Sequence, residues 1–137
     1  MSADAPPRGA ANDKKGPAMI TIYHNPRCSK SRETLALVQA AAERLGEPVE
    51  IVEYLKEPPS LSTLRQLHTL LGVPVREMLR DNEAPYAELG LADPGLTDAE
   101  LLAAVADNPI LLQRPVVVRN RRAAIGRPPE NVAPLLA

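Results

Sequence analysis

The chain has 137 residues, of which 45% are hydrophobic and 24% charged, a balance typical of one folded globular domain. Three Tyr are its only aromatic residues and the net charge is -1, so a base-stacking platform or a general electrostatic attraction to nucleic acid or anionic membranes is excluded. Apolar runs fall short of the roughly 20 residues that span a bilayer, and no secretory signal is apparent, so we expect a cytoplasmic protein without a membrane partner.

The first elements indicate where the folded domain begins. Residues 1–18 are rich in Ala, Pro, Gly and charge and lack periodicity, which predicts a flexible N-terminal extension before one domain over 19–137. Ile20 and Ile22 alternate with Thr21 in a short strand that should end at the Asn25-Pro26 breaker. The domain therefore opens on a strand.

A helix should follow the lone cysteine of the chain, Cys28. Four apolar side chains recur at helical spacing, and Gly46 is a stop signal; the four are Leu35, Val38, Ala42 and Leu45. Alternation over 49–54 predicts a second strand before Pro58. Together these segments form a βαβ unit with Cys28 at the entry of its helix.

The rest of the chain is predicted to form helices and then a hairpin. Ser60 can cap a leucine-rich helix that Gly72 ends, and the segment 97–100 (TDAE) is a capping box for another helix. Runs over 115–119 and 123–125 flank a turn at Asn120-Arg121, which predicts a hairpin. A final helix should start at Pro128 or the residue after it and be short, because Pro134 interrupts it.

The surroundings of Cys28 favour a reactive thiol over a buried structural one. A cysteine at a helix N-terminus has its thiolate favoured by the helix dipole and by free backbone N–H groups. Four cationic or titratable side chains lie within four positions of Cys28, namely His24, Arg27, Lys30 and Arg32. Any cation aimed at the sulfur would lower the thiol pKa further. Free cysteines often simply pack in a core, so the competing interpretation is a small hydrophobic residue.

The motif around the cysteine is C-x-x-S. Ser31 stands where dithiol oxidoreductases carry a second cysteine, and it could hydrogen-bond a thiolate but not resolve a covalent intermediate. With one cysteine in the chain, a second thiol must come from outside. A phosphatase-type C-x5-R loop is excluded, because Arg32 lies only four residues after Cys28.

The segment His24 to Arg32, HNPRCSKSR, resembles the H-N-P-x-C-x-x-S-R catalytic segment of the arsenate reductase family with a thioredoxin-like fold. The resemblance covers essentially 19–137 and continues through further segments, namely 54–59, 78–80, 85–91, 108–110, 114–115 and 126–128. It implies an α/β, thioredoxin/glutaredoxin-like domain, with a central mixed sheet of about four strands flanked by helices and a helical insertion in the middle of the chain.

The resemblance also implies a set of site residues. By motif, Arg80, Arg114 and Arg127 match three arginines that bind the oxyanion, and a guanidinium suits this task because it offers a planar fork of donors and stays charged. His24 matches a histidine that helps activate the thiol, and a cis bond is implied at Pro115. Without the resemblance, each arginine would be an ordinary surface charge and His24 a hydrogen-bonding residue at a strand end. His68, which has no visible partner, is interpreted as structural.

The implied activity is reduction of arsenate to arsenite by Cys28, with glutathione as co-substrate, glutaredoxin as partner, and neither a bound cofactor nor a metal. Two alternatives remain open. A glutaredoxin-like redox protein or thiol-stress regulator of the same fold would not turn over arsenate, and it would have no need for the three arginines. A third candidate is an enzyme that reduces another oxyanion or handles glutathione adducts, since the same arginines could hold their anionic groups.

Overall fold

A four-stranded mixed sheet lies at the centre of the protein, in the strand order β2-β1-β3-β4. The structure is a computed structural model that describes residues 18–137, so the predicted N-terminal extension lies, except for its last residue, outside the described part. β1 (Ile20–His24) pairs parallel with β2 (Val49–Glu53) and antiparallel with β3 (Val116–Arg119), which pairs antiparallel with β4 (Arg122–Ile125). This is the predicted mixed sheet.

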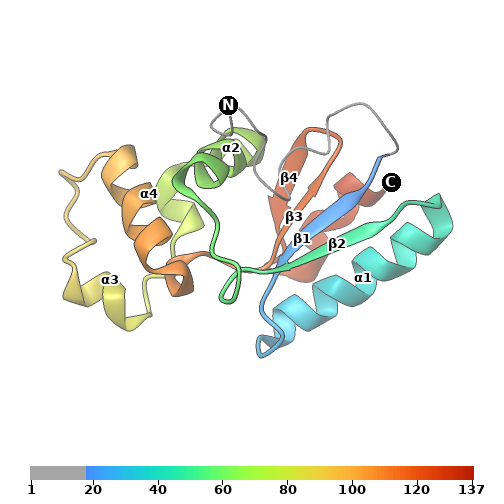
Figure 1. Cartoon of the computed structure of the whole chain (residues 1–137), viewed down its shortest axis with the longest axis horizontal. Coiled ribbons are helices and arrows are strands. Elements are labelled where there is room, and N and C mark those ends of the chain that lie inside the picture. Colours follow the sequence, from blue (N-terminus) through green and yellow to red (C-terminus); the bar gives the residue numbers. More distant parts are fainter. Residues whose placement is uncertain (1–17) are drawn as a thin grey trace.

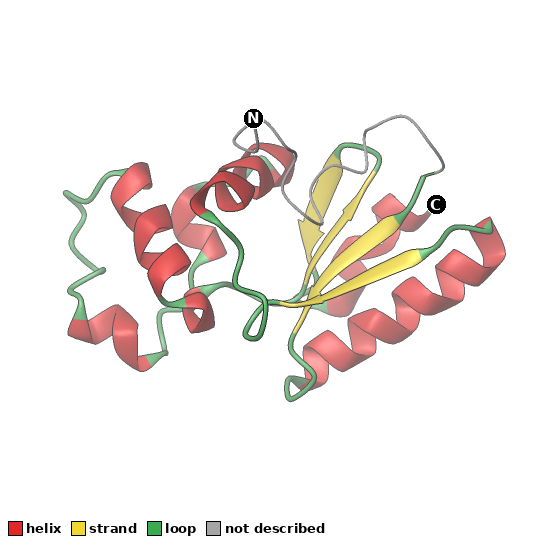
Figure 2. Cartoon of the chain, viewed as in Figure 1, coloured by secondary structure: helices red, strands yellow, loops and turns green. Residues whose placement is uncertain are grey.

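Helices cover both faces of the sheet (Figures 1 and 2). On one face, Ile22 and Val117 pack against α1 (Ser29–Leu45) and the C-terminal 3-10 helix η4 (Pro129–Leu136). On the other face, Tyr23 belongs to a second core that includes the helical middle of the chain. All five residues of β1 are buried, because the strand is central and alternate side chains enter opposite cores.

The helical insertion predicted for the middle of the chain contains five short helices. They are α2 (Leu61–Leu71), η2 (Val75–Met78), α3 (Ala84–Glu88), α4 (Asp98–Asp107) and η3 (Pro109–Leu111). Figure 1 shows α2 beside the sheet, with α4 and α3 progressively farther from it. The chain returns from η3 into β3, so this insertion separates the βαβ unit from the hairpin.

Most helix ends follow the local signals in the sequence. The Ser60 hydroxyl accepts a hydrogen bond from the Thr63 N–H, and Gly72 ends α2 with a φ of 65°. Thr97 and Glu100 form the predicted capping box of α4. A left-handed backbone conformation such as that of Gly72 favours glycine, because glycine has no Cβ to clash. These predictions are confirmed.

The C-terminal part agrees with the predicted hairpin and differs in its last helix. Asn120 and Arg121 have φ values of 52° and 63°, as a type I′ turn requires. Pro134 was expected to interrupt a short helix, but η4 continues through it to Leu136 as a 3-10 helix. The buried side chains of Val132 and Leu135 pack on the sheet core, which holds this turn-like winding in place despite the missing N–H.

Within residues 18–137 we find no helix with the length and apolar character that crossing a bilayer requires.

Candidate active site

Cys28 is the N-cap residue of α1, at the end of the loop that leaves β1. Its backbone is extended, with φ -95° and ψ 123°, and its N–H donates to the Asn25 carbonyl while its own carbonyl accepts the first helical hydrogen bond, from Arg32. The thiol is partly exposed. The cysteine is therefore neither packed in the core nor fully in solvent, which fits a reactive group better than a structural one.

The pKa of the Cys28 thiol lies below its ordinary value. Burial by itself would raise it, but the backbone N–H of Ser31, the guanidinium of Arg114 and the backbone N–H of Lys30 together outweigh burial. Both N–H groups belong to the first turn of α1, whose partial positive charge favours the thiolate although the Cys28 side chain makes no capping hydrogen bond. The site favours the thiolate.

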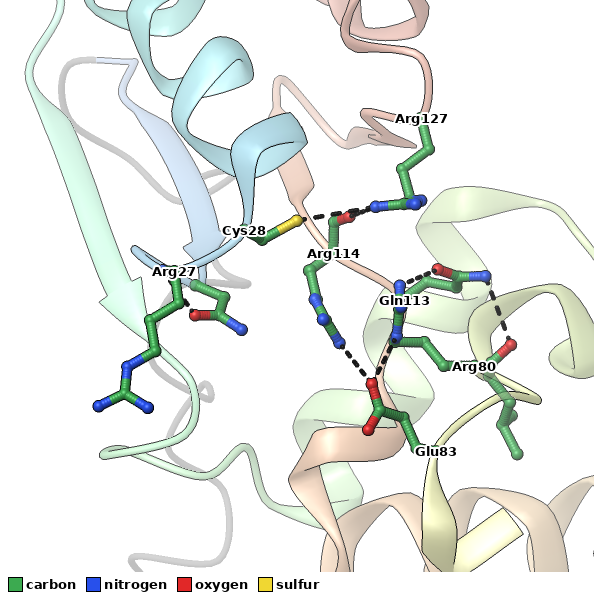
Figure 3. Close-up of polar contacts among 9 residues, drawn as sticks. Arg27, Cys28, Arg80, Glu83, Gln113, Arg114 and Arg127 are labelled. Carbon is green, nitrogen blue, oxygen red and sulfur yellow. Dashed lines mark hydrogen bonds and ion pairs between the residues drawn. The ribbon is translucent and has the colours of Figure 1, made fainter. Parts of the chain in front are cut away.

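The cations next to Cys28 in sequence do not provide this stabilisation. Arg27 points away from the sulfur (Figure 3). Arg32 donates to the Pro26 carbonyl at 2.9 Å, and Lys30 is an exposed residue whose backbone, not its ammonium, influences the thiol. The charge that matters comes from Arg114, which lies far away in the sequence. Proximity in sequence was therefore a poor guide to which cation acts on the sulfur.

His24 and Ser31 form a buried network beside the cysteine. The His24 Nδ1 lies 2.7 Å from the Ser31 Oγ, which also accepts the Asn25 N–H at 3.0 Å. Burial lowers the pKa of His24, Glu53 opposes this and Arg32 adds to it, so the imidazole is neutral near pH 7. Its tautomer sets which of the His24 Nδ1 and the Ser31 Oγ is the donor. In this arrangement the Ser31 hydroxyl holds the β1–α1 loop, and no hydrogen bond joins it or His24 to the sulfur within the described residues.

Two of the predicted arginines reach the cysteine from the ends of the hairpin strands. Arg127 follows β4, and its Nη1 lies 3.7 Å from the Cys28 Sγ and 3.5 Å from the Arg114 carbonyl. Arg114 precedes β3, and its peptide bond to Pro115 is cis, as the resemblance implies. A second cis bond, Arg127–Pro128, was not predicted. The guanidinium of Arg127 is exposed, so solvent screens its charge more than that of Arg114, whose side chain is 12% exposed.

Gly126 allows the strand ends to come this close. A Cβ at this position would lie 2.6 Å from the Thr34 Oγ1 and 2.9 Å from the Pro115 Cγ. The Gly126 N–H donates to the Pro115 carbonyl at 2.9 Å. From the sequence alone, Gly126 was not predicted to be a close-contact residue. The available signal was its place directly before Arg127.

Arg80 comes from the helical insertion, two residues after η2. Its backbone N–H donates to the Leu111 carbonyl at 2.7 Å, and its Nη1 donates to the Gln113 Oε1 at 3.4 Å. Gln113 precedes Arg114, so the same short segment positions two of the three predicted arginines. The fold thus brings side chains from three separate parts of the chain to one edge of the sheet.

Glu83 lies between Arg80 and Arg114. This residue was not predicted from the sequence. Its Oε2 accepts from the Arg80 Nε at 3.2 Å and forms an ion pair with the Arg114 Nη1 at 3.5 Å (Figure 3). A signal was available, because Glu83 lies only three residues after Arg80 and is therefore within reach of its side chain. The contact between Glu83 and Arg114 could not be predicted from local sequence, because the two residues are 31 positions apart and only the tertiary fold brings them together.

Two buried polar atoms near Arg114 have no hydrogen-bond partner among the described residues. They are the Arg114 Nε and the hydroxyl of Tyr54, whose side chain is fully buried. Burial raises the pKa of the Tyr54 hydroxyl, and Arg114 is the strongest of the groups that oppose the rise. Tyr54 is therefore a neutral phenol beside the arginine cluster. Residues 18–137 contain no group of three His, Cys, Asp or Glu placed to hold a metal.

The arrangement combines a nucleophile with an anion-binding cluster. A thiolate at a helix N-terminus can attack an electrophilic centre, and guanidinium groups beside it can hold a tetrahedral oxyanion through paired hydrogen bonds. Cys28, Arg114 and Arg127 lie together, while Arg80 is joined to them through Glu83. The geometry suits attack on an anion more than simple disulfide exchange.

Comparisons with known proteins show which family the chain resembles in sequence and in fold. Residues 23–135 match the ArsC family. The chain is 52% identical over 114 residues to the uncharacterized protein YfgD of Escherichia coli strain K12, which covers 82% of this chain and 92% of that protein. It is 48% identical over 118 residues to an arsenate reductase of Neisseria meningitidis serogroup A, covering 85% and 97%. A solved arsenate reductase from Vibrio cholerae superposes with a TM-score of 0.79 and 45% identity, covering 88% of this chain and 99% of that one.

Proposed function

The chain belongs to the ArsC family, and on that premise we propose that it reduces arsenate to arsenite through Cys28, with glutathione and glutaredoxin as the external reductants. The observation that carries the proposal is a partly exposed thiol of lowered pKa whose sulfur lies 3.7 Å from the Arg127 guanidinium and under the influence of Arg114. The names of the Neisseria and Vibrio relatives give the substrate.

In the first step, arsenate binds beside the sulfur with its charge offset by Arg80, Arg114 and Arg127. The Cys28 thiolate attacks arsenic, an S–As bond forms, and one As–O bond breaks as its oxygen leaves as water after taking up protons. Arsenic remains As(V) at this stage. The role of the arginines is to offset the negative charge of the substrate, which would otherwise repel the thiolate.

External thiols then supply the two electrons. Glutathione attacks the arsenic adduct and displaces a second oxygen as water. A glutaredoxin thiolate next attacks the glutathione sulfur, and the electron pair of the broken S–As bond stays on arsenic, which becomes As(III), while a mixed disulfide leaves. Water releases arsenite and regenerates Cys28. The chain cannot supply the second thiol itself, because it contains one cysteine.

Neutral His24 and Ser31 have a supporting part in this proposal. Their hydrogen bond holds the loop that carries Cys28, and through Ser31 it fixes the backbone N–H group that faces the sulfur. A neutral imidazole can also accept a proton as the thiol ionises. In this proposal Ser31 acts as a positioning group, and His24 positions the loop and can take up the thiol proton.

The rival class, a thiol redox protein or regulator without arsenate turnover, is tested by an omission assay. The complete chain is supplied with arsenate, glutathione, glutaredoxin, glutathione reductase and NADPH, and arsenate-dependent NADPH oxidation is followed. We expect turnover that disappears when arsenate, glutathione or glutaredoxin is left out. Turnover without glutaredoxin would replace the proposed reductant, and a complete system without arsenate-dependent oxidation would favour the regulator.

A further inference from the structure

The most informative feature that the proposed function does not use is the carboxylate of Glu83. One oxygen of this side chain meets both Arg80 and Arg114, at 3.2 and 3.5 Å (Figure 3). Two guanidinium groups that converge on one carboxylate oxygen are arranged as they would be around one oxygen of a bound oxyanion. Glu83 thus stands at the place where two of the arginines would hold the substrate.

Helix capping does not explain why a glutamate is found here. Glu83 is the N-cap residue of α3, yet its side chain accepts no hydrogen bond from the first turn of that helix. Ser, Thr, Asp and Asn are the residues that cap this position well. The side chain is directed to the arginines instead, so its role concerns them.

The contact is built so that it can open. Both distances exceed the 2.7–2.9 Å of strong charge-assisted hydrogen bonds. The Glu83 side chain is 24% exposed, against 11% for Arg80 and 12% for Arg114, so it is the member of the trio closest to solvent. The Arg114 Nε has no partner in this arrangement. A better acceptor could therefore replace the carboxylate.

Charge balance favours that replacement. With Glu83 in place, three guanidinium groups face one carboxylate and the Cys28 thiolate, which leaves one net positive charge for an incoming dianion. With Glu83 turned out to solvent, the cluster has two positive charges in excess, which matches a dianionic oxyanion. Binding should thus be coupled to loss of the Glu83 contacts.

We infer that Glu83 is an internal competitor for the oxyanion site, which occupies Arg80 and Arg114 in the free enzyme and must be displaced before a tetrahedral dianion can bind. This inference rests on the proposed function only in treating the three arginines as the oxyanion site. It makes Glu83 a residue that sets the affinity for arsenate and for inorganic phosphate, which has the same shape and charge.

The test measures binding of inorganic phosphate, which Cys28 does not reduce, by titration calorimetry on the complete chain at low ionic strength. Glu83→Gln keeps the size of the side chain and removes its charge. We expect its dissociation constant for phosphate to fall about tenfold relative to the unchanged protein, because the anion no longer has to displace a charged group. Unchanged or weaker binding would overturn the inference and assign Glu83 to orienting the arginines.

A matched control separates competition from general charge. Glu88→Gln removes the same charge from the same helix at an exposed position, and we expect it to change the phosphate dissociation constant less than twofold. An equal gain in phosphate affinity in this control would show a long-range effect and overturn the inference.

A double variant tests whether the contact with Arg80 matters. In the Arg80→Gln background, the gain in phosphate affinity from Glu83→Gln should be smaller, because one of the two guanidinium groups that Glu83 occupies is gone. A gain of full size would contradict the proposal.

If Glu83→Gln does not fold, Glu83→Ser keeps the inference testable. Serine is a good N-cap residue and cannot reach both arginines, so this variant should be at least as stable and should also bind phosphate more tightly. The outcome is independent of arsenate turnover. If the protein binds phosphate in the expected order of variants but does not reduce arsenate, the proposed function fails and the role of Glu83 stands.

Discussion

Among single residues, Arg114 has the largest side-chain effect on the proposed nucleophile. It is mostly buried, it precedes the cis-proline Pro115, and its guanidinium lowers the pKa of the Cys28 thiol. The Nη1 of Arg127 lies 3.7 Å from the sulfur, but this residue is exposed to solvent. A buried charge is screened less than an exposed one, so the two arginines should differ in effect.

We predict that Arg114→Gln raises the pKa of Cys28 and that Arg127→Gln raises it less. The measurement is the rate of alkylation by iodoacetamide as a function of pH, for which Cys28 is the one reactive thiol of the chain. Far-ultraviolet circular dichroism confirms that each variant is folded. If Arg114→Gln left the titration unchanged, the guanidinium would not be what stabilises the thiolate.

Some residues of the site could be predicted from the sequence and others could not. The position of Cys28 at a helix entry follows from local signals, and so does the prediction of a thiolate. The identity of the cation that lowers the thiol pKa did not follow from local signals. Arg27, Lys30 and Arg32 are neighbours of Cys28 in the chain, but the guanidinium that acts on the sulfur belongs to Arg114. Arg114 and Arg127 entered through the family resemblance, and Glu83 was missed, because its contact with Arg114 is made by the tertiary fold.

At the scale of elements, the ends of the helices and strands place the site. Cys28 begins α1, Arg114 precedes β3, and Arg127 follows β4, with Gly126 packed against Thr34 of α1 and against Pro115. The Thr34 hydroxyl donates to the Lys30 carbonyl at 2.8 Å and reaches the Gly126 carbonyl at 3.4 Å. This packing sets how closely Arg127 approaches the sulfur.

We predict that Gly126→Ala lowers kcat/KM for arsenate about tenfold or more, because the new Cβ pushes the chain that carries Arg127 away from α1. Overpacking of this kind should also cost about 1–3 kcal/mol of unfolding free energy, measured with urea. Gly95→Ala is the control, since the atoms nearest its Cβ belong to the flexible side chain of Asp93. Equal activity in the two variants would contradict the prediction.

Elements with strong local signals were predicted well, and those set by tertiary packing were not. Ser60, Gly72 and the Thr97 capping box act within a few residues, so sequence alone locates the ends of α2 and α4. The short helices η2, α3 and η3 have three to five residues each, too few for a periodic pattern. η4 continues through Pro134 because its buried side chains hold it against the core.

At the scale of the whole molecule, a bidentate ion pair joins segments that lie far apart in sequence. Arg119 of β3 donates its Nε and Nη2 to the two carboxylate oxygens of Glu47, which follows α1, and its Nη1 to the Leu135 carbonyl of η4. Hydrogen bonds from Arg119 lower the pKa of Glu47, burial opposes this, and the charge of Arg119 adds to the lowering. This pair ties the C-terminus to the sheet.

We predict that Glu47→Gln lowers the free energy of unfolding at pH 7 by about 1–3 kcal/mol. Because the Glu47 pKa is lower in the folded state, the pair stabilises the protein above the unfolded-state pKa, about 4.3, and this contribution is lost as pH falls through the folded-state value. The gap between the unchanged protein and the variant, measured by urea denaturation, should therefore narrow toward pH 3.

The control for this prediction is Glu43→Gln, at an exposed position on α1. This change should alter the free energy of unfolding very little at either pH. A gap for Glu47→Gln of the same size at pH 7 and pH 3 would mean that packing, not ionisation, causes the loss. Because no contact joins Glu47 to the Cys28 site among the described residues, arsenate turnover of the folded variant should stay unchanged.

The proposed reaction depends on a bond between the Cys28 sulfur and arsenic. The most direct measurement is arsenite produced from arsenate by Cys28→Ser beside Ser29→Ala, each supplied with glutathione and glutaredoxin, with arsenite separated and quantified by chromatography with elemental detection. We expect no arsenite above background from Cys28→Ser and substantial production from Ser29→Ala. Arsenite formed by Cys28→Ser at the rate of the unchanged protein would show that this sulfur is not the nucleophile.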